Sequence, residues 1–512
     1  MRIRLVLALL PVVGAFQLPF KIPFFSQSVQ QPLVQPANSR PKIAIIGAGA
    51  GGASAAFWIA KAKERFGGID EVEVDVYDKN SYIGGRTVVY PYDDSTNFSA
   101  VELGASIFVK ANKNIWRAVD EFNLTRRDFR DENGMGIWDG EKLLFTTSGG
   151  WWSWWDSAKA LLRYGFHSPR RTQQFVDSMI DKFLTLYAPD APKWDNITHL
   201  SSSLNWTDLV SQSTSEYLQS QGVSNKFISE LVEASTRVNY GQNADKIHAL
   251  EGACSLAPTG ASSVEGGNFQ VFEQFLKRSQ ANVYLNTSVN SITPTTANQW
   301  VLDSDRGSET YTAIILAAPY HSTKIRVPTD ISSRIPPQPY VHLHVTLLST
   351  TQPSVPAQSF SLPSSTKIPA MLLTTFEGAR NGGKEPEFNS LSYHGLISEG
   401  EWVVKIFSKK RISNKWLSKM FDNQVGWVLR KEWDAYPVLP PTSSFPDVKL
   451  APNFYYVNSF EPFISTMETQ TLASRNVVDM LLKDSFDSGI CGPAGTPLND
   501  TEKEDYVFGW DC

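Results

Sequence analysis

Residues 42–52 read Lys-Ile-Ala-Ile-Ile-Gly-Ala-Gly-Ala-Gly-Gly, a short apolar run that passes directly into the pattern Gly47-x-Gly49-x-x-Gly52. The Ala-rich segment 53–63 that follows is predicted to be a helix, which places the glycines between a strand and a helix. In that setting Gly47 permits a tight turn, Gly49 lets a pyrophosphate approach the backbone, and Gly52 lets the helix pack closely on the strand. The phosphate then lies at the helix N-terminus. The stretch therefore predicts an α/β dinucleotide-binding unit.

A second predicted strand, residues 73–77, leads into Asp78. This carboxylate follows Gly52 by 26 residues, close to the position at which such folds place the acid that binds a ribose hydroxyl. A glycine motif alone is weak evidence. Two strands, a glycine turn and a correctly spaced acid together predict a bound dinucleotide.

Two further motifs indicate which dinucleotide is bound. They are Gly84-Gly85-Arg86 and Glu102-Leu-Gly104-Ala105. A glycine pair and an arginine offer additional backbone N–H groups and a cation to a diphosphate. The alternative to a diphosphate site is that Gly84-Gly85 forms an ordinary turn and Arg86 is a surface charge. In this order the motifs resemble the flavin amine oxidase and phytoene desaturase superfamily, and the resemblance implies FAD.

That superfamily joins a discontinuous Rossmann-type FAD-binding domain to a mixed α+β substrate domain, and we expect the same α/β fold here. A late helix starting near Met467 would direct its N-terminal N–H groups at the flavin, although it could equally be a helix that only covers the sheet. The residues that we expect to bind FAD are Gly47, Gly49, Gly52, Asp78, Gly85, Arg86, Gly104, Ala105, Val289 and Met467.

Length and composition agree with such an enzyme. The chain has 512 residues, 42% of them hydrophobic and 12% aromatic, which is enough for two or more domains. Its net charge of −5 carries no signature of nucleic-acid binding. We see no Cys/His spacing typical of a metal site.

The domain organisation that we predict is discontinuous. The FAD-binding domain is expected in three parts and the substrate domain in two, the first of them mainly helical. The expected intervals are 1–15 for a signal peptide, 16–40 for a linker or propeptide, 41–112, 251–325 and 446–485 for the FAD-binding domain, 113–250 and 326–445 for the substrate domain, and 486–512 for a polar tail.

The N-terminus predicts entry into the secretory pathway. A basic start is followed by an apolar run that is too short to span a bilayer, with a cleavage site after Ala15. No later run is apolar for long enough to predict a transmembrane helix. Of the three cysteines, Cys491 and Cys512 could pair in an oxidising compartment, which would leave Cys254 over. Six Asn-x-Ser/Thr sequons begin at Asn97, Asn123, Asn196, Asn205, Asn286 and Asn499. We therefore expect a secreted, lysosomal or vacuolar glycoprotein.

Three more blocks give a narrower resemblance. They are Arg237-Val-Asn-Tyr240-Gly241-Gln242, Ser263-Val-Glu265-Gly-Gly-Asn268 and residues 314–321, Ile-Ile-Leu-Ala-Ala-Pro-Tyr-His. Together with the glycine motif they resemble the prenylcysteine oxidase family, also called farnesylcysteine lyases, over about residues 40–485. The resemblance implies an FAD thioether oxidase that converts farnesyl- or geranylgeranyl-cysteine to cysteine, a prenyl aldehyde and hydrogen peroxide, with dioxygen as the acceptor.

Candidate substrate residues follow from the same blocks, and each has a plainer alternative. Arg237 and Tyr240 could hold the cysteine carboxylate and amine, or could simply end a helix that Gly241 caps. Glu265 could activate water, or could be a surface acid. His321 is more often structural than catalytic at such a strand end. The tryptophans at 151–155 could line a prenyl groove, contact a membrane surface, or belong to the core.

Three other functions remain open at this point. The same FAD fold would serve an oxidase of a prenylated or polyketide-type small molecule in a biosynthetic pathway. An amine oxidase would usually show an aromatic pair beside the flavin, and the aromatic residues at 454–456 and 460 form no decisive pattern of that kind. A flavin-binding glycoprotein without catalysis is the non-enzymatic reading.

Overall fold

The computed structural model describes residues 40–66, 69–91, 100–129, 134–148, 153–493, 495–498, 501–503 and 505–512, without the side chains of 153 and 154. The predicted signal peptide and linker, the sequons at Asn97 and Asn499, and Trp151 and Trp152 lie outside this part of the chain. Within it, no helix is both long enough and apolar enough to cross a bilayer.

A six-stranded sheet carries the dinucleotide motif. Its order is β19–β20–β13–β1–β2–β9, and every neighbouring pair is parallel except β19 with β20. The bounds are Lys449–Ala451, Phe454–Tyr456, Ala313–Leu316, Lys42–Ile46, Glu73–Tyr77 and Asn282–Tyr284 in that order. Strands from the beginning, middle and end of the chain therefore meet in one sheet, which makes this domain discontinuous.

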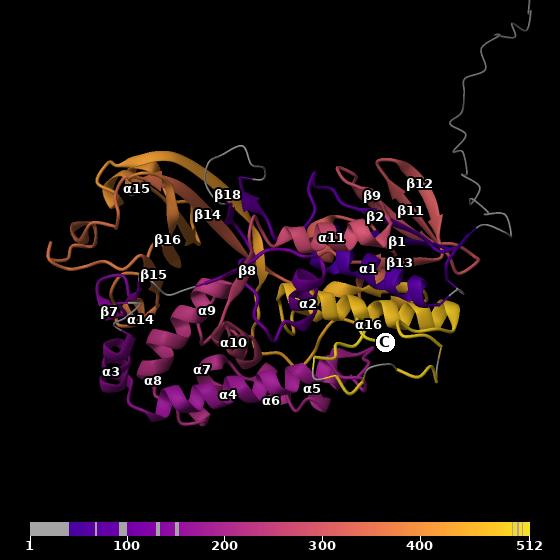
Figure 1. Ribbon diagram of the computed structural model, residues 1–512, viewed down its shortest axis with the longest axis horizontal. Helices are drawn as coiled ribbons and strands as arrows, with labels where there is room; N and C mark the ends of the chain where they lie inside the picture. The colour runs from indigo at the N-terminus through magenta and orange to yellow at the C-terminus, as the bar shows by residue number, and fades with distance from the viewer. Residues whose placement is uncertain are drawn as a thin grey trace, which may run out of the picture. The chain divides into compact units, whose positions relative to one another are not determined.

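The alternation of side chains along β1 explains the layers on either side of this sheet. Ile43 and Ile45 belong to the large core that includes helices α1 (Ala50–Arg65) and α16 (Met467–Phe486). Ala44 and Ile46 face the opposite core, which includes the small sheet β10–β11–β12 (Val289–Pro294, Trp300–Ser304, Gly307–Tyr311). A strand covered on both faces has no polar side to present, so its sequence is an uninterrupted apolar run. Figure 1 shows α1 and α16 running alongside each other beneath this sheet, with α11 (Phe269–Ser279) also packed on α1.

A second, seven-stranded sheet lies in the intervals predicted for the substrate domain, in the order β18–β14–β17–β16–β15–β6–β7. It is antiparallel except where β15 runs parallel to β6. The bounds are Val425–Pro437, Tyr340–Thr350, Glu401–Ser408, Ser390–Ser398, Met371–Thr374, Met135–Trp138 and Leu143–Thr146 in that order. Two hairpin strands of this sheet, β6 and β7, come from the interval that we predicted to be mainly helical, because period-2 patterns of only four residues are too short to stand out among helices.

Apart from the short strand β5 (Arg126–Asp128), the other elements described in that interval are helices. They begin with α2 and then run from α3 to α10, interrupted by a 3₁₀ turn, η2, and a π-helical turn, η3. Their bounds are Lys113–Glu121 (α2), Ser153–Tyr164 (α3), His167–Leu184 (α4), Thr185–Tyr187 (η2), Ile197–Ser203 (α5), Thr207–Ser211 (α6), Thr214–Ser220 (α7), Asn225–Phe227 (α8), Ile228–Val232 (η3), Glu233–Tyr240 (α9) and Ala249–Leu256 (α10).

Short elements complete the described chain. Two two-stranded ribbons pair β3 with β4 and β5 with β8. The remaining bounds are Val89–Tyr90 (β3), Val101–Glu102 (β4), Arg126–Asp128 (β5), Ser262–Val264 (β8), Tyr320–Thr323 (α12), Thr329–Ser332 (α13), Ala357–Phe360 (η4), Glu377–Arg380 (α14), Asn414–Met420 (α15) and Val457–Phe460 (η5).

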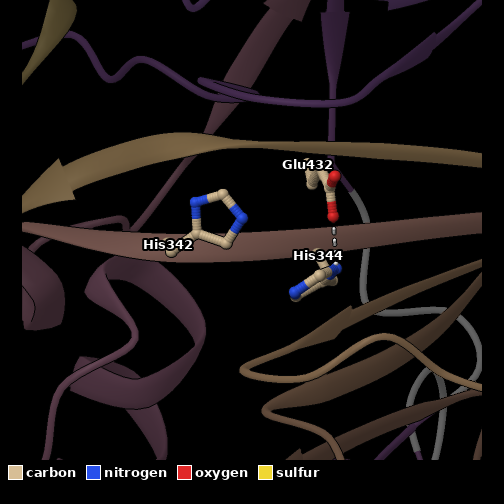
Figure 2. Close-up of side chains that lie close together, drawn as sticks. All are labelled: His342, His344 and Glu432. Carbon is tan, nitrogen blue, oxygen red and sulfur yellow. Dashed lines mark ion pairs between the residues drawn. The ribbon is translucent and has the colours of Figure 1, made fainter. Parts of the chain in front are cut away.

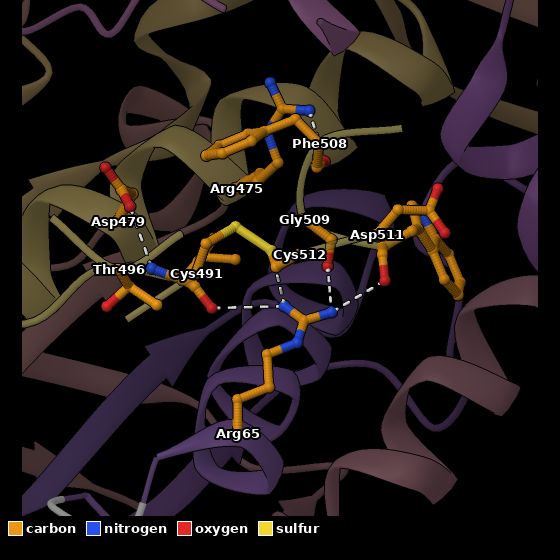
Figure 3. Close-up of a disulfide and its surroundings, with 12 residues drawn as sticks. Arg65, Arg475, Asp479, Cys491, Thr496, Phe508, Gly509, Asp511 and Cys512 are labelled. Carbon is orange, nitrogen blue, oxygen red and sulfur yellow. Dashed lines mark hydrogen bonds between the residues drawn. A yellow bond between two sulfur atoms is a disulfide. The ribbon is translucent and has the colours of Figure 1, made fainter. Parts of the chain in front are cut away.

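The C-terminal segment, which we expected to be a polar tail, packs onto α1 instead. Trp510 is 7% exposed and contacts the rings of Phe57 and Trp58. Cys512 forms a disulfide with Cys491, and Arg65 donates hydrogen bonds to the carbonyls of Gly509 and Trp510 at 3.0 and 2.9 Å (Figure 3). A few aromatic residues in a polar sequence are enough to anchor it, because each buries a large apolar area.

Candidate functional site

The two domains enclose a cavity of about 480 Å³ at the carboxyl ends of the parallel strands, where open α/β sheets bind their ligands. On one side lie the turn between β1 and α1, the loop after β2 and the first turn of α16. On the other side lie the start of β14 and residues 433–436 of β18. Nine of the predicted cofactor residues line it, namely Gly47, Gly49, Asp78, Gly85, Arg86, Gly104, Ala105, Val289 and Met467.

Gly52, the tenth predicted residue, supports the cavity from behind. A Cβ atom at this position would lie 1.8 Å from the carbonyl oxygen of Gly47, so only glycine allows α1 to start this close to β1. Gly47 itself has φ +110°, and Gly85 has φ +60° with its Cβ position 3.2 Å from the Cα of Gly49. Two backbone segments, at Gly47–Gly52 and at Gly85, therefore meet without side chains, which leaves N–H groups accessible to an anion.

Asp78 stands at the end of β2, beside this glycine turn. Its carboxylate accepts hydrogen bonds from the backbone N–H of Ala48 at 2.8 Å and of Asn80 at 2.8 Å. The parallel pairing of β1 with β2 brings Asp78 next to Gly47, whose N–H donates to the carbonyl of Tyr77 at 2.7 Å. The predicted ribose-binding acid thus lies where the spacing placed it.

Helix α16 begins at the cavity wall. Thr466 caps it by accepting the N–H of Thr469 at 3.0 Å, and Ser465, Thr466, Met467 and Gln470 all line the cavity. The capped helix directs the positive end of its dipole towards the space where a ligand would lie.

Two buried polar atoms at this wall have no hydrogen-bond partner among the described residues. They are Oδ1 of Asn458 and Nε2 of Gln470, and both residues line the cavity. Buried polar groups are nearly always partnered in folded proteins. One unpaired acceptor and one unpaired donor at the same wall therefore fit a polar ring system such as that of a flavin, which offers both donors and acceptors.

An ion pair at the cavity joins the loop after β2 to the segment that precedes α16. Arg86 forms an ion pair with Glu461, which is 1% exposed and also accepts the hydroxyl of Tyr340 at 2.6 Å and the amide of Asn458 at 3.0 Å. Burial alone would lower the pKa of Arg86, but the Glu461 carboxylate raises it above its ordinary value. For Tyr340, burial and then Glu461 raise the pKa, so its hydroxyl stays protonated. The hydrogen bond from Tyr340 to Glu461 links β14 to the segment that precedes α16.

The three predicted catalytic residues do not reach this cavity. Arg237 is buried, with 1% of its surface exposed. Its guanidinium donates hydrogen bonds to Thr374, Asn243 and Asn389 at 3.0, 2.8 and 3.4 Å. Every arm of the side chain is engaged within the protein. The helix-end alternative is the one that the structure shows, since Gly241 with φ +66° caps α9.

Tyr240 and Glu265 are likewise outside the cavity. Tyr240 is buried, and a hydrogen bond links its side chain to Glu251 one layer behind the wall. Glu265 is exposed, and its backbone N–H donates to the carbonyl of Thr125. Glu265 is absent from the cavity lining, and its exposure agrees with the surface-acid alternative. His321 is exposed too, and its ring contacts the carbonyls of Ile335 and Pro336 at 3.0 and 3.1 Å.

The sequence did not reveal the residues opposite the glycine turn. Tyr340, Trp433, Tyr436, Asn458 and Glu461 line the cavity, yet they come from three separate segments with no shared motif. One clue was available, because Glu461 interrupts the apolar run Val-Asn-Ser-Phe-Glu-Pro-Phe-Ile at 457–464. A carboxylate in such a run is buried only if it has partners.

Comparisons with known proteins match the segments that line both sides of the cavity. The sequence profile of the family described as prenylcysteine lyase matches residues 148–489, and that of an NAD(P)-binding Rossmann-like domain matches residues 45–122. Farnesylcysteine lyase of Arabidopsis thaliana is 28% identical over 87% of this chain and 89% of its own. Prenylcysteine oxidase 1 of Homo sapiens is 28% identical over 85% of this chain and 87% of its own.

Solved structures of flavin-type oxidases share the fold. Putrescine oxidase bound to putrescine superposes with a TM-score of 0.56 at 13% identity, covering 86% of this chain and 99% of that one. Cyclohexylamine oxidase from Brevibacterium oxydans IH-35A gives 0.54 at 15% identity, covering 85% and 97%. Identities this low establish the architecture and nothing about the substrate. The profile match over most of the chain goes further, and on it the protein belongs to the prenylcysteine lyase family.

Proposed function

We propose that this protein is an FAD-dependent thioether oxidase that cleaves farnesyl- or geranylgeranyl-L-cysteine to cysteine, the prenyl aldehyde and hydrogen peroxide. One observation carries the proposal. The wall opposite the glycine turn, which includes Tyr340, Trp433, Tyr436 and Glu461, lies entirely within the prenylcysteine lyase match. The family resemblance therefore covers the surface that would select a substrate, in addition to the surface that would hold a dinucleotide.

The residues on the first wall fit FAD. Backbone N–H groups around Gly49 and Gly85 would hold the diphosphate, and Asp78 would accept a ribose hydroxyl. The unpaired atoms of Asn458 and Gln470 would pair with the flavin ring. When bound, FAD supplies a hydride acceptor for the prenyl carbon next to sulfur and a centre that dioxygen reoxidises.

The residues on the second wall would orient the substrate. The aromatic faces of Trp433 and Tyr436 offer apolar area to a prenyl chain. The hydrogen bond from Tyr340 to Glu461 fixes β14 against the segment that precedes α16, and a fixed wall would hold the reacting carbon in one position. The apolar wall would limit the access of bulk water, and one water molecule would add to the oxidised carbon, after which the hemithioacetal releases cysteine and aldehyde. Substrate, water and dioxygen together balance the three products.

The test begins with the visible spectrum of the purified protein. Farnesylcysteine added anaerobically should bleach the oxidised-flavin band, and air should restore it with farnesal and peroxide as products. Putrescine and a prenylated alcohol serve as comparison substrates for the amine oxidase and biosynthetic alternatives. Bleaching by one of these and not by farnesylcysteine would overturn the substrate, and protein without flavin would overturn the cofactor.

The same protein should work at a membrane surface, where prenyl compounds partition. Helix α3 and the start of α4 expose a group of large apolar side chains, among them Leu162 at 88% and Phe166 at 60% exposed, with Arg170 beside them. Apolar and basic side chains together favour an anionic lipid surface. Vesicles containing phosphatidylserine should retain the protein, and Leu162→Asp should reduce retention, whereas the equally apolar control Leu396→Asp on β16 should not. Equal retention of the two variants would contradict this.

We also propose that the mature protein travels the secretory route. The disulfide between Cys491 and Cys512 supports an oxidising compartment, and exposed asparagines of three sequons support glycosylation. These are Asn123, Asn205 and Asn286. Expression in a eukaryotic host should yield a product that begins near residue 16 and loses mass on deglycosylation, whereas an intact Met1 would contradict the signal peptide.

A further inference from the structure

Strands β14 and β18 bring two histidines and two carboxylates together, and of these four residues Asp434 alone also lines the cavity. The antiparallel register pairs His342 with Asp434 and His344 with Glu432. Residues two apart on a strand point to the same face, and cross-strand partners are neighbours. The four side chains therefore form a compact square on one face of the seven-stranded sheet.

The contacts within this square already resemble those around a metal ion. Nδ1 of His344 lies 3.2 Å from Oε2 of Glu432, and Nδ1 of His342 lies 3.1 Å from Oδ1 of Asp434. One ligand atom from each of His342, His344 and Glu432 lies within 4.8 Å of the others, and Figure 2 shows the Glu432 carboxylate directed at His344 with the His342 ring beside them. Ligands about 2.1 Å from a tetrahedral ion are about 3.4 Å apart, so a small rotation of the exposed His342 ring would complete the site.

We propose that His342, His344 and Glu432 bind a divalent transition-metal ion, with Zn²⁺ as the reference ion. Two imidazoles and one carboxylate suit Zn²⁺ and Cu²⁺ and do not suit Mg²⁺ or Ca²⁺, which prefer oxygen ligands. The three ligands leave one coordination position open to water or an external ligand.

Asp434 acts as a positioning residue in this arrangement. If Nδ1–H of His342 donates to Asp434, the Nε2 lone pair is free for the ion, which is the usual way in which a carboxylate orients a ligating histidine. Arg430, next along the same face, donates to the carbonyl of Ile412 and to Asn414, so its charge is occupied outside the square.

The position of the proposed metal site beside the cavity suggests what the ion would do. Tyr340 precedes His342 by two residues and Tyr436 follows Asp434 by two, and both tyrosines line the cavity. An ion that bridges β14 and β18 would clamp together the two strands that supply the cavity's aromatic wall. The site does not depend on the identity of the substrate or on the flavin.

Calorimetric titration of untagged protein with Zn²⁺ alone tests the proposal. We expect one ion per chain, with affinity reduced about tenfold or more in His342→Ala, His344→Ala, Glu432→Gln and the positioning variant Asp434→Asn. The matched control His199→Ala removes an exposed histidine on α5 and should bind as the parent does. Circular dichroism of each variant checks that it is folded.

A spectroscopic measurement identifies the ligands directly. Cu²⁺ bound to the parent protein should show electron paramagnetic resonance splitting from two imidazole nitrogens, and His344→Ala should remove one of them. Absence of Zn²⁺ binding up to millimolar concentration, binding unchanged in the three ligand variants, or a Cu²⁺ spectrum without nitrogen splitting would each overturn the site.

Discussion

Replacing Glu251 by glutamine should change how the stability of this protein depends on pH. Glu251 lies on α10 and is completely buried, and it accepts the backbone N–H of Ser465 at 3.1 Å and hydrogen bonds with Tyr240. Burial raises the pKa of its carboxyl to about 8, and the hydrogen bonds offset only part of that shift. Glutamine has the same shape and can serve both partners without a charge.

The direction of this pH dependence follows from the number of protons bound by the folded and the unfolded protein. The folded protein retains the Glu251 proton up to about pH 8, whereas an unfolded chain releases it near pH 4.5. Between these values the folded state holds more protons, so stability falls as pH rises. A shift of about 3.5 units at about 1.36 kcal/mol each amounts to about 5 kcal/mol over the whole interval, and to about 2.5 kcal/mol between about pH 5.5 and about pH 7.5.

Urea unfolding followed by tryptophan fluorescence measures this difference. Wild type should lose about 2.5 kcal/mol more than Glu251→Gln between the two pH values. Glu102 and Glu468, whose pKa values are also raised by burial to about 7, contribute equally to both proteins and cancel. Glu265→Gln, at an exposed position, is the control and should follow wild type. Parallel pH profiles for wild type and Glu251→Gln would refute the assignment of a protonated buried carboxyl.

Three further changes test the fold and the cavity. Gly52→Ala places a methyl group against the carbonyl oxygen of Gly47. We expect the free energy of unfolding to fall by about 1–3 kcal/mol and the flavin content, measured by absorbance, to fall as well. An unchanged flavin content would contradict the close helix packing. Cys491→Ser removes the disulfide with Cys512, which closes a loop across a sequence separation of 21. We expect its free energy of unfolding to fall by about 3 kcal/mol in chemical denaturation. Wild type unfolded in the presence of a reductant should have the same stability as this variant. Tyr340→Phe removes one hydrogen bond to the buried Glu461, with an expected loss of about 1.5–3 kcal/mol and a slower anaerobic bleaching by farnesylcysteine; a rate equal to that of wild type would exclude a role for this hydroxyl.

The residues on the glycine-turn side of the cavity could be predicted because each is required by its neighbours in the sequence. A tight turn needs Gly47, a close helix needs Gly52, and the acid after the next strand must be Asp78. Each requirement concerns neighbours in sequence or adjacent parallel strands, and each permits few residue types. The start of α16 near Met467 was predicted from the superfamily resemblance, and the structure begins the helix at this residue.

The substrate half could not be predicted in the same way. Glu461 becomes a clamp only because Arg86, Tyr340 and Asn458 approach it from other elements. For Arg237 the sequence left substrate binding and a helix end both open, and only the structure shows that its donors are engaged by Thr374, Asn243 and Asn389. Side-chain partners of this kind are supplied by the packing of distant segments.

The sequence by itself therefore determined the dinucleotide-binding unit, its family resemblance and the residues of the glycine turn, because backbone geometry at those positions excludes most alternatives. The tertiary structure alone decided which wall faces that turn, which titratable groups are buried, and that His342 and His344 lie beside Glu432 across two strands. The physical reason is that burial, and the pairing of charges far apart in sequence, are properties of the packed chain and of no segment within it.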